Sequence, residues 1–256
     1  MLDKGMKNEQ IKVNWSGEVV SVQPRSTVWR YITDNRTHRE KGFNVFLKGD
    51  VYYGSDEVHT EKGSKKYDFC IAISEKQEQK LEIHIGDELK GTAWTKKYPE
   101  IEFADYYRVG GIKKIRSGSE DIARKMTVTI DEINKRYDGT PIPRVNCADY
   151  PGPPWKQEVP PLEIYSWRGE RMLSKASWRG KCFQCIWANM ANVTVQYDFD
   201  RNLVRNRFET FCYGPLSCEY YKMGPARAVP YNGMTGVKDE GWLDEICVEY
   251  RQDPDE

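Results

Sequence analysis

Four cysteines in the last third of the chain constrain its fold more than any other feature. They form two pairs, C-x2-C and C-x5-C, with 26 residues between the pairs. The two residues inside the first pair let both sulfurs face one point from a single turn. We expect a hairpin to bring the second pair back to the first. The spacing therefore predicts one metal site, with the ligands Cys182, Cys185, Cys212 and Cys218.

Two disulfides and four buried thiols are the alternatives to a metal site. The chain begins with the polar segment MLDKGMKNEQIK, which lacks the apolar core of a signal peptide. No stretch approaches the roughly 18 consecutive apolar residues that span a bilayer. We therefore expect a cytoplasmic protein that does not enter membranes. Because cytoplasmic thiols stay reduced, this location favours metal over disulfides.

Zn²⁺ is the metal that we expect, and a [4Fe–4S] cluster is the alternative. Four thiolates complete the tetrahedral shell of zinc, so the ion would organise the fold and take no part in catalysis. The order of C-x2-C turn, hairpin and second cysteine pair resembles treble-clef and zinc-ribbon modules. An iron–sulfur cluster also takes four thiolates. Aromatic residues flank the sulfurs and would shield a cluster from water: Phe183, Trp187, Phe211 and Tyr213.

The N-terminal half has the pattern of β-strands almost throughout. In Gly42–Lys48, for example, Phe43, Val45 and Leu47 fall on one face of an alternating strand. Turn residues such as Gln23-Pro24-Arg25 separate the runs. Many strands with little helix between them favour a small closed barrel or a sandwich. The predicted strands are Lys12–Val22, Thr27–Thr33, Gly42–Lys48, Tyr67–Ser74, Asp87–Thr95 and Tyr106–Ile115.

Two features favour the barrel. Gly17 and Gly91 lie inside predicted strands, where glycine permits the bends that close a small barrel. The stretch His84–Trp94 places Gly-Asp before an alternating strand that contains a further glycine. This pattern resembles the start of a strand in OB-fold proteins, and the resemblance covers residues 11–116. It implies a barrel that binds single-stranded nucleic acid, oligosaccharide or protein on one face.

The fold class that we expect is mainly β: an OB-like small β-barrel followed by a small α+β four-cysteine metal module. The barrel would occupy residues 11–116 and the metal module residues 163–236. Residues 117–162 between them are predicted to be helical and then a connector with seven prolines, which exclude a helix or a central strand. Residues 237–256 form an acidic tail, with eight Asp/Glu against two Lys/Arg.

No recognised catalytic motif is present. The three histidines form no H-E-x-x-H sequence, and the chain lacks a G-x-S-x-G turn, a Walker A loop and a dinucleotide fingerprint. A zinc deaminase needs proline before its C-x-x-C pair, where this chain has Lys181. We therefore expect a protein without catalytic activity. An iron–sulfur enzyme that processes nucleic acid, with carboxylates that converge in space, is the less favoured alternative.

Basic and aromatic residues interleave at several places, which indicates nucleic-acid binding. Aromatic rings stack on bases, and basic side chains contact phosphates. Trp29 and Tyr31 share one face of a predicted strand, about 7 Å apart, and basic residues follow them. Three arginines lie at the tip of the predicted hairpin. The predicted binding residues are Trp29, Tyr31, Arg36, His38, Arg39, Trp94, Lys96, Lys97, Arg201, Arg205 and Arg207.

These patterns together predict a non-catalytic subunit of a larger complex that binds single-stranded or structured DNA or RNA. The same aromatic patches suit a protein partner, so a protein-interaction adaptor is the alternative from a different class. Binding to an oligonucleotide weakens steeply as salt rises, which separates the two functions.

Overall fold

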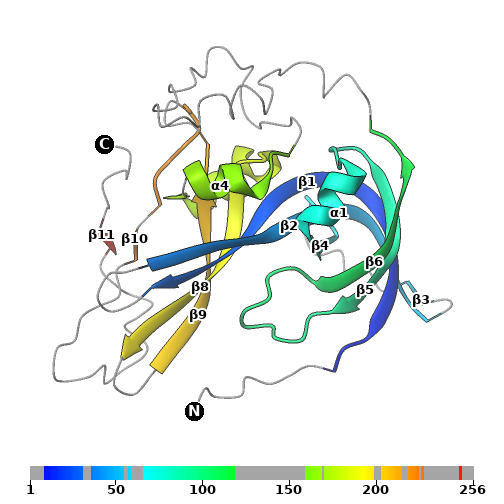
Figure 1. Ribbon diagram of the computed structural model, residues 1–256, viewed down its shortest axis with the longest axis horizontal. Helices are drawn as coiled ribbons and strands as arrows, with labels where there is room; N and C mark the ends of the chain where they lie inside the picture. The colour runs from blue at the N-terminus through cyan, green and yellow to red at the C-terminus, as the bar shows by residue number, and fades with distance from the viewer. Residues whose placement is uncertain are drawn as a thin grey trace.

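A nine-stranded sheet that curls partly back on itself dominates the computed structural model of the chain (Figure 1). Its first strands are β1 (Lys12–Arg30), β2 (Arg36–Tyr53), β3 (Glu57–Val58), β4 (Phe69–Ile73), β5 (Glu88–Thr95) and β6 (Tyr106–Arg116). Its last strands are β7 (Arg171–Met172), β8 (Ala188–Asp198) and β9 (Leu203–Cys212). A separate pair consists of β10 (Ala226–Arg227) and β11 (Val248–Glu249).

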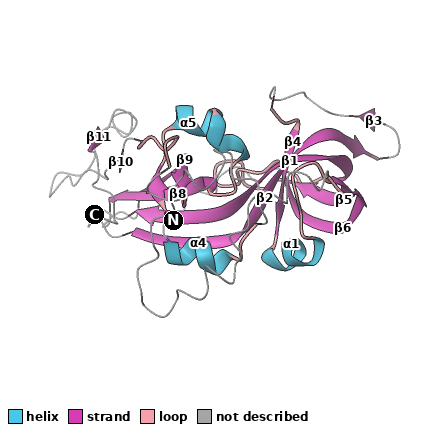
Figure 2. Cartoon of the chain, turned by 90° about the horizontal axis from the view of Figure 1, so that it is seen from above, coloured by secondary structure: helices cyan, strands magenta, loops and turns pink. Residues whose placement is uncertain are grey.

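The helical elements are short. They are α1 (Glu75–Leu81), α4 (Leu162–Arg168), α5 (Lys175–Arg179) and the 3-10 turn η2 (Lys181–Gln184). Figure 2 shows α5 on one side of the strands and α1 and α4 on the other. Among the residues that the structure describes, no helix has the length and apolar character needed to cross a membrane.

The structure describes residues 9–30, 36–54, 57–58, 66–118, 159–168, 170–198, 203–214, 218–224, 226–227 and 248–249. The predicted helical and proline-rich connector therefore lies outside the described residues, apart from its two ends. The same is true of the acidic tail, apart from β11.

Five strands make up a ring that β1 closes. β1 pairs with β2 along one edge and with β5 along the other, so the order is β1-β2-β4-β6-β5 and back to β1. Neighbours in the ring are antiparallel except β4 and β6, which meet in parallel at Ile71 and Tyr106. The expected mainly β class is confirmed, with the strands arranged as a partly closed ring.

β1 runs without a break through Gln23–Arg25, so the turn predicted there was wrong. A bulge between Pro24 and Ser26 absorbs the irregularity, and the strand continues. β1 pairs with β5 only as far as Glu18 and with β8 only from Thr27. Pro24 therefore lies where one edge of β1 has no partner strand, which is a position at which strands tolerate proline.

The β8–β9 hairpin extends the same sheet. Thr27–Arg30 of β1 pair in parallel with Asn192–Val195 of β8, and β9 pairs with β8 in antiparallel register. The sequence predicted this hairpin, and its two strands are confirmed. Its register places Cys212 opposite Ala188, close to the C-x2-C turn. The hairpin therefore returns the chain to the first cysteine pair.

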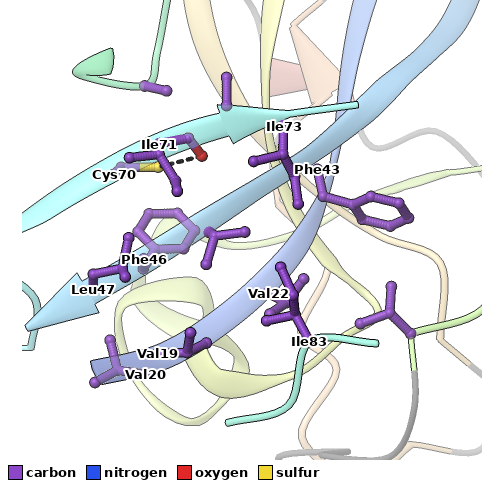
Figure 3. Close-up of a cluster of buried hydrophobic side chains, with 14 of the residues drawn as sticks. Val19, Val20, Val22, Phe43, Phe46, Leu47, Cys70, Ile71, Ile73 and Ile83 are labelled. Carbon is purple, nitrogen blue, oxygen red and sulfur yellow. Dashed lines mark hydrogen bonds between the residues drawn. The ribbon is translucent and has the colours of Figure 1, made fainter. Parts of the chain in front are cut away.

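A continuous hydrophobic core fills the ring and extends beneath the cysteine turn. At its centre the ring of Phe46 lies 4.9 Å from that of Tyr67 and 5.0 Å from that of Phe183 in η2, between centroids. Side chains that are far apart in the sequence thus share one core. Figure 3 shows part of it, with Val19, Val20, Val22, Phe43, Phe46, Leu47, Cys70, Ile71, Ile73 and Ile83 labelled.

Candidate ligand pocket and cysteine cluster

A pocket of about 560 Å³ opens where the far end of β1, the β5–β6 loop and the β8–β9 hairpin meet. Val28 is fully buried, while Trp29 beside it is 37% exposed. Ile101, on the β5–β6 loop, is 39% exposed and also lines the pocket. The aromatic and charged lining residues are Arg25, Trp29, Lys41, Tyr98, Glu100, Glu102, Phe103 and Tyr107.

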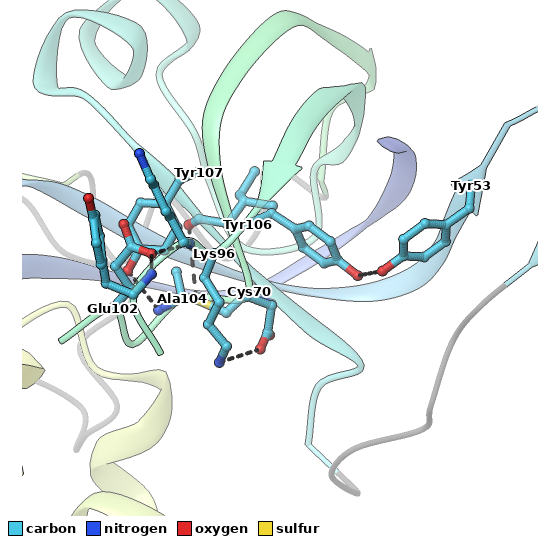
Figure 4. Close-up of polar contacts among 11 residues, drawn as sticks. Tyr53, Cys70, Lys96, Glu102, Ala104, Tyr106 and Tyr107 are labelled. Carbon is cyan, nitrogen blue, oxygen red and sulfur yellow. Dashed lines mark hydrogen bonds and ion pairs between the residues drawn. The ribbon is translucent and has the colours of Figure 1, made fainter. Parts of the chain in front are cut away.

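Glu102 holds the β5–β6 loop in shape. Its Oε2 accepts the backbone N–H groups of Lys97 at 2.5 Å and Tyr98 at 2.7 Å. Lys96 forms an ion pair with Asp105 at 3.7 Å at the base of the loop, and Figure 4 shows these contacts together. The Glu102 carboxylate is thus engaged by the loop backbone. The loop presents Tyr98 to the pocket in a fixed position.

Arg25 and Lys41 supply the positive charge of the pocket. The Arg25 Nη2 donates to the Lys41 carbonyl at 2.8 Å, and its guanidinium lies 5.7 Å from the centroid of the Tyr107 ring. Burial lowers the pKa of Arg25, although Tyr107 opposes this change. Burial and then the neighbouring Arg25 lower the pKa of Lys41. Two cations held this close together favour an anion nearby.

Three of the predicted binding residues belong to this region. Trp29 lines the pocket, and Lys96 and Lys97 begin the loop that forms one wall. The Lys97 ammonium lies 5.4 Å from the centroid of the Tyr98 ring. Trp94 is half-buried in β5, opposite Lys12, and does not line the pocket.

The other predicted binding residues lie away from the pocket, or only their backbone is described, or they lie outside the described residues. Arg39 is exposed on β2, and Arg207 on β9 forms an ion pair with Glu209. For three further residues only the position of the backbone is described, in β2 or β9: Arg36, His38 and Arg205. Tyr31 and Arg201 lie outside the described residues.

Sequence reasoning missed most of the pocket. Arg25 stood in a predicted turn, and Lys41 lay outside every basic–aromatic run. A signal for the hairpin wall was available, because Asn192 and Thr194 alternate with the buried Val193 and Val195. This alternation places a polar face on β8.

The two cysteine segments come together, because the Tyr213 backbone N–H, next to Cys212, donates to the Trp187 carbonyl, close to Cys185, at 2.8 Å. Cys182, Cys185 and Cys212 are buried, and Cys218 is half-buried. Burial, followed by the proximity of Cys212 and Cys218, raises the pKa of Cys182 to about 12. Three of the four sulfurs are thus close enough to influence one another electrostatically.

Hydrogen-bond donors surround Cys212. The Gly214 backbone N–H donates to its Sγ at 3.2 Å, and the Arg171 Nη2 lies 4.0 Å from the same sulfur. The Arg171 guanidinium is itself held by the Gly214 carbonyl at 2.7 Å and lies 4.1 Å from the Tyr221 ring centroid. N–H donors of this kind stabilise a metal-bound thiolate.

The donor set therefore fits a thiolate-bound ion in its chemistry. In the described part of the chain, however, no three His, Cys, Asp or Glu side chains converge closely enough to hold a metal as they lie. An ion would have to draw the sulfurs together. The predicted metal site stays a prediction.

No protein-family model, curated protein or solved structure matches this chain.

Proposed function

We propose that this protein binds single-stranded nucleic acid in the pocket between β1, the β5–β6 loop and the β8–β9 hairpin, and performs no chemistry on it. The order of the five ring strands supports an OB-like barrel. Barrels of that fold bind oligonucleotides with the loop between the first two strands and the loop between the fourth and fifth. In this chain the second of these is the β5–β6 loop, which lines the pocket.

The observation that carries the proposal is an exposed tryptophan beside two cations, the half-buried Arg25 and the exposed Lys41. Trp29 offers a flat surface to a base, and stacking contributes roughly 1–3 kcal/mol per base. Arg25 and Lys41 provide charge for the adjoining phosphate. Tyr98 on the preformed loop offers a second ring. The pocket thus combines the two kinds of group that single-stranded nucleic acid requires.

We also propose that Zn²⁺ bound by Cys182, Cys185, Cys212 and Cys218 stabilises the wall of this pocket, with a [4Fe–4S] cluster as the alternative. The Phe183 carbonyl, next to Cys182, accepts hydrogen bonds from the side chains of Ser21 and Gln23 in β1, each at 2.6 Å. A metal that fixes the cysteine turn would therefore also fix the strand that carries Trp29. The ion would be structural, since four thiolates leave no open position.

Fluorescence anisotropy with labelled 12-residue single-stranded DNA and RNA tests the proposed function. We expect binding that weakens steeply between about 50 and 200 mM salt, since each neutralised phosphate adds about −0.7 to the slope of log K against log salt. Trp29→Ala should weaken binding about 5- to 150-fold, which corresponds to roughly 1–3 kcal/mol.

Ile115→Ala is the matched control, because Ile115 is also exposed and apolar but does not line the pocket. It should leave binding unchanged. Failure to bind any DNA or RNA oligonucleotide at low salt would contradict the proposal. In that case the exposed Trp29 and Ile101 at the rim would favour the protein-interaction adaptor.

A further inference from the structure

The β8–β9 hairpin gives the pocket a polar wall that the five-stranded ring alone does not have. Asn192 and Thr194 of β8 and Asn206 of β9 line the pocket. The residues between them, Val193 and Val195, pack with Val28 in a separate buried cluster. Strand alternation therefore directs a row of amide and hydroxyl groups at any ligand.

These three side chains form a chain of hydrogen bonds in which each donates to the next. The Asn192 Nδ2 donates to Thr194 Oγ1 at 3.5 Å, and Thr194 Oγ1 donates to Asn206 Oδ1 at 2.8 Å. Since the Asn192 amide donates to Thr194, its oxygen is left facing away from this chain of bonds. Asn192 is only 7% exposed, and its Oδ1 has no hydrogen-bond partner among the described residues.

Arg25 offers the complementary group. Its Nη2 is used by the Lys41 carbonyl, but its Nε is buried and has no hydrogen-bond partner within the described part of the chain. A pocket that contains both an unused acceptor and an unused donor is incomplete, because buried polar groups are normally paired. Both atoms are shielded from water. A ligand therefore reaches them only when side chains at the rim of the pocket shift; Trp29 and Ile101, which are 37% and 39% exposed, are large apolar side chains there.

We propose that this pocket recognises one base of the bound strand and prefers adenine or cytosine to thymine or uracil. This inference rests on the proposed function. Adenine and cytosine carry an exocyclic amine next to a ring nitrogen that accepts. The amine would donate to Asn192 Oδ1, and the ring nitrogen would accept from Arg25 Nε. Thymine and uracil present a carbonyl and an N–H at the same two positions. Their carbonyl would face Asn192 Oδ1, which is also an acceptor, and their N–H would face Arg25 Nε, which is also a donor.

The test compares the affinities of 12-residue homopolymers of deoxyadenosine, deoxycytidine and thymidine, together with the adenosine, cytidine and uridine RNA strands. We expect the adenine and cytosine strands to bind about 5- to 150-fold more tightly than the thymine and uracil strands, the range that a paired base contact usually provides. Asn192→Leu should remove this preference and leave the weaker, salt-dependent binding to every strand.

Two further variants separate base recognition from folding. Thr194→Val should relax the preference, because the Asn192 amide is then free to turn and donate. Thr92→Val is its control, since the Thr92 hydroxyl bonds to the Gly110 carbonyl away from the pocket. Asn192→Leu should lower the thermal midpoint of unfolding little, because it gives up only the long 3.5 Å hydrogen bond to Thr194 and also removes a buried oxygen without a partner. A preference that persists in Asn192→Leu would overturn the inference.

The failure of this inference is distinct from failure of the proposed function. If all homopolymers bind the wild-type protein equally, with strong salt dependence, base recognition is wrong and nucleic-acid binding stands. If none of them binds at low salt, both are wrong.

Discussion

Replacing Gln23 with leucine tests how the cysteine turn is fastened to β1. Gln23 is fully buried, and its amide bridges two elements. The Nε2 donates to the Phe183 carbonyl at 2.6 Å, and the Oε1 accepts from Trp178 Nε1 at 3.1 Å. Leucine has nearly the same volume, so the substitution removes both hydrogen bonds and leaves little cavity.

The expected cost follows from the partners left behind. The Phe183 carbonyl keeps its hydrogen bond from Ser21, so it loses little. The Trp178 N–H is buried and loses the partner that Gln23 provides, which costs about 1–3 kcal/mol. The burial of the leucine side chain offsets a part of this. We therefore expect Gln23→Leu to lower the free energy of unfolding by about 2 kcal/mol.

Urea unfolding followed by circular dichroism measures this change. Trp178→Phe removes the other partner, and in the double variant neither group is left unpaired. We expect the double variant to lose about 1 kcal/mol less stability than the sum of the losses in the two single variants.

Gln10→Leu provides a matched control, because the Gln10 side chain makes one half-buried hydrogen bond within the described residues, to the Thr95 carbonyl. Its cost should stay below about 0.5 kcal/mol. The reasoning would be refuted by a Gln23→Leu loss as small as that of the control, or by strictly additive losses in the double variant.

Two other predictions concern acid stability and metal content. Burial raises the pKa of Asp87, but backbone N–H groups and Lys114, 2.7 Å away, outweigh it and hold the pKa below 3.8. The stability that Asp87 contributes is therefore present above pH 3.8 and lost as the pH falls through the lower folded value. Asp87→Asn should cost about 2–3 kcal/mol at pH 7, and in urea titrations this cost should shrink as the pH falls below 3.8; a cost that does not change with pH would contradict this. For protein purified without oxygen, elemental analysis should give about one zinc per chain, or four irons if a cluster is bound. Cys182→Ser should abolish this metal content, and Cys70→Ala, which replaces a core cysteine, should not. The absence of both zinc and iron from fresh wild-type protein would rule out the site.

The strands could be predicted from the sequence, but which of their faces are buried could not. Alternation placed Phe43, Val45 and Leu47 on one face, yet Phe46 on the opposite face is also fully buried. The reason is tertiary: α1 and α4 contact β2, and Phe183 of the distant η2 packs on Phe46. A pattern within one strand carries no information about what covers its second face.

The pocket was largely beyond prediction because three distant segments form it. Trp29 was found from its strand pattern, but Arg25 and Asn192 reach the pocket only because β1 continues past Pro24 and pairs with β8. Parallel pairing between segments so far apart leaves no mark in local sequence. The hairpin that returns the chain to the cysteine turn was predictable, because its strands and its turn are adjacent.

The late arrival of β8 has a consequence for synthesis on the ribosome. Ser26 and Asn189, which are hydrogen-bonded across the junction of β1 and β8, are 163 residues apart. At typical elongation rates, the end of β1 therefore waits roughly ten to thirty seconds for its neighbour. During that interval Val28 lacks its cover, and the strand presents an open edge on which another nascent chain could add. Truncation before β8 would make this exposure permanent, so fragments limited to the ring carry an aggregation hazard that the complete sheet removes.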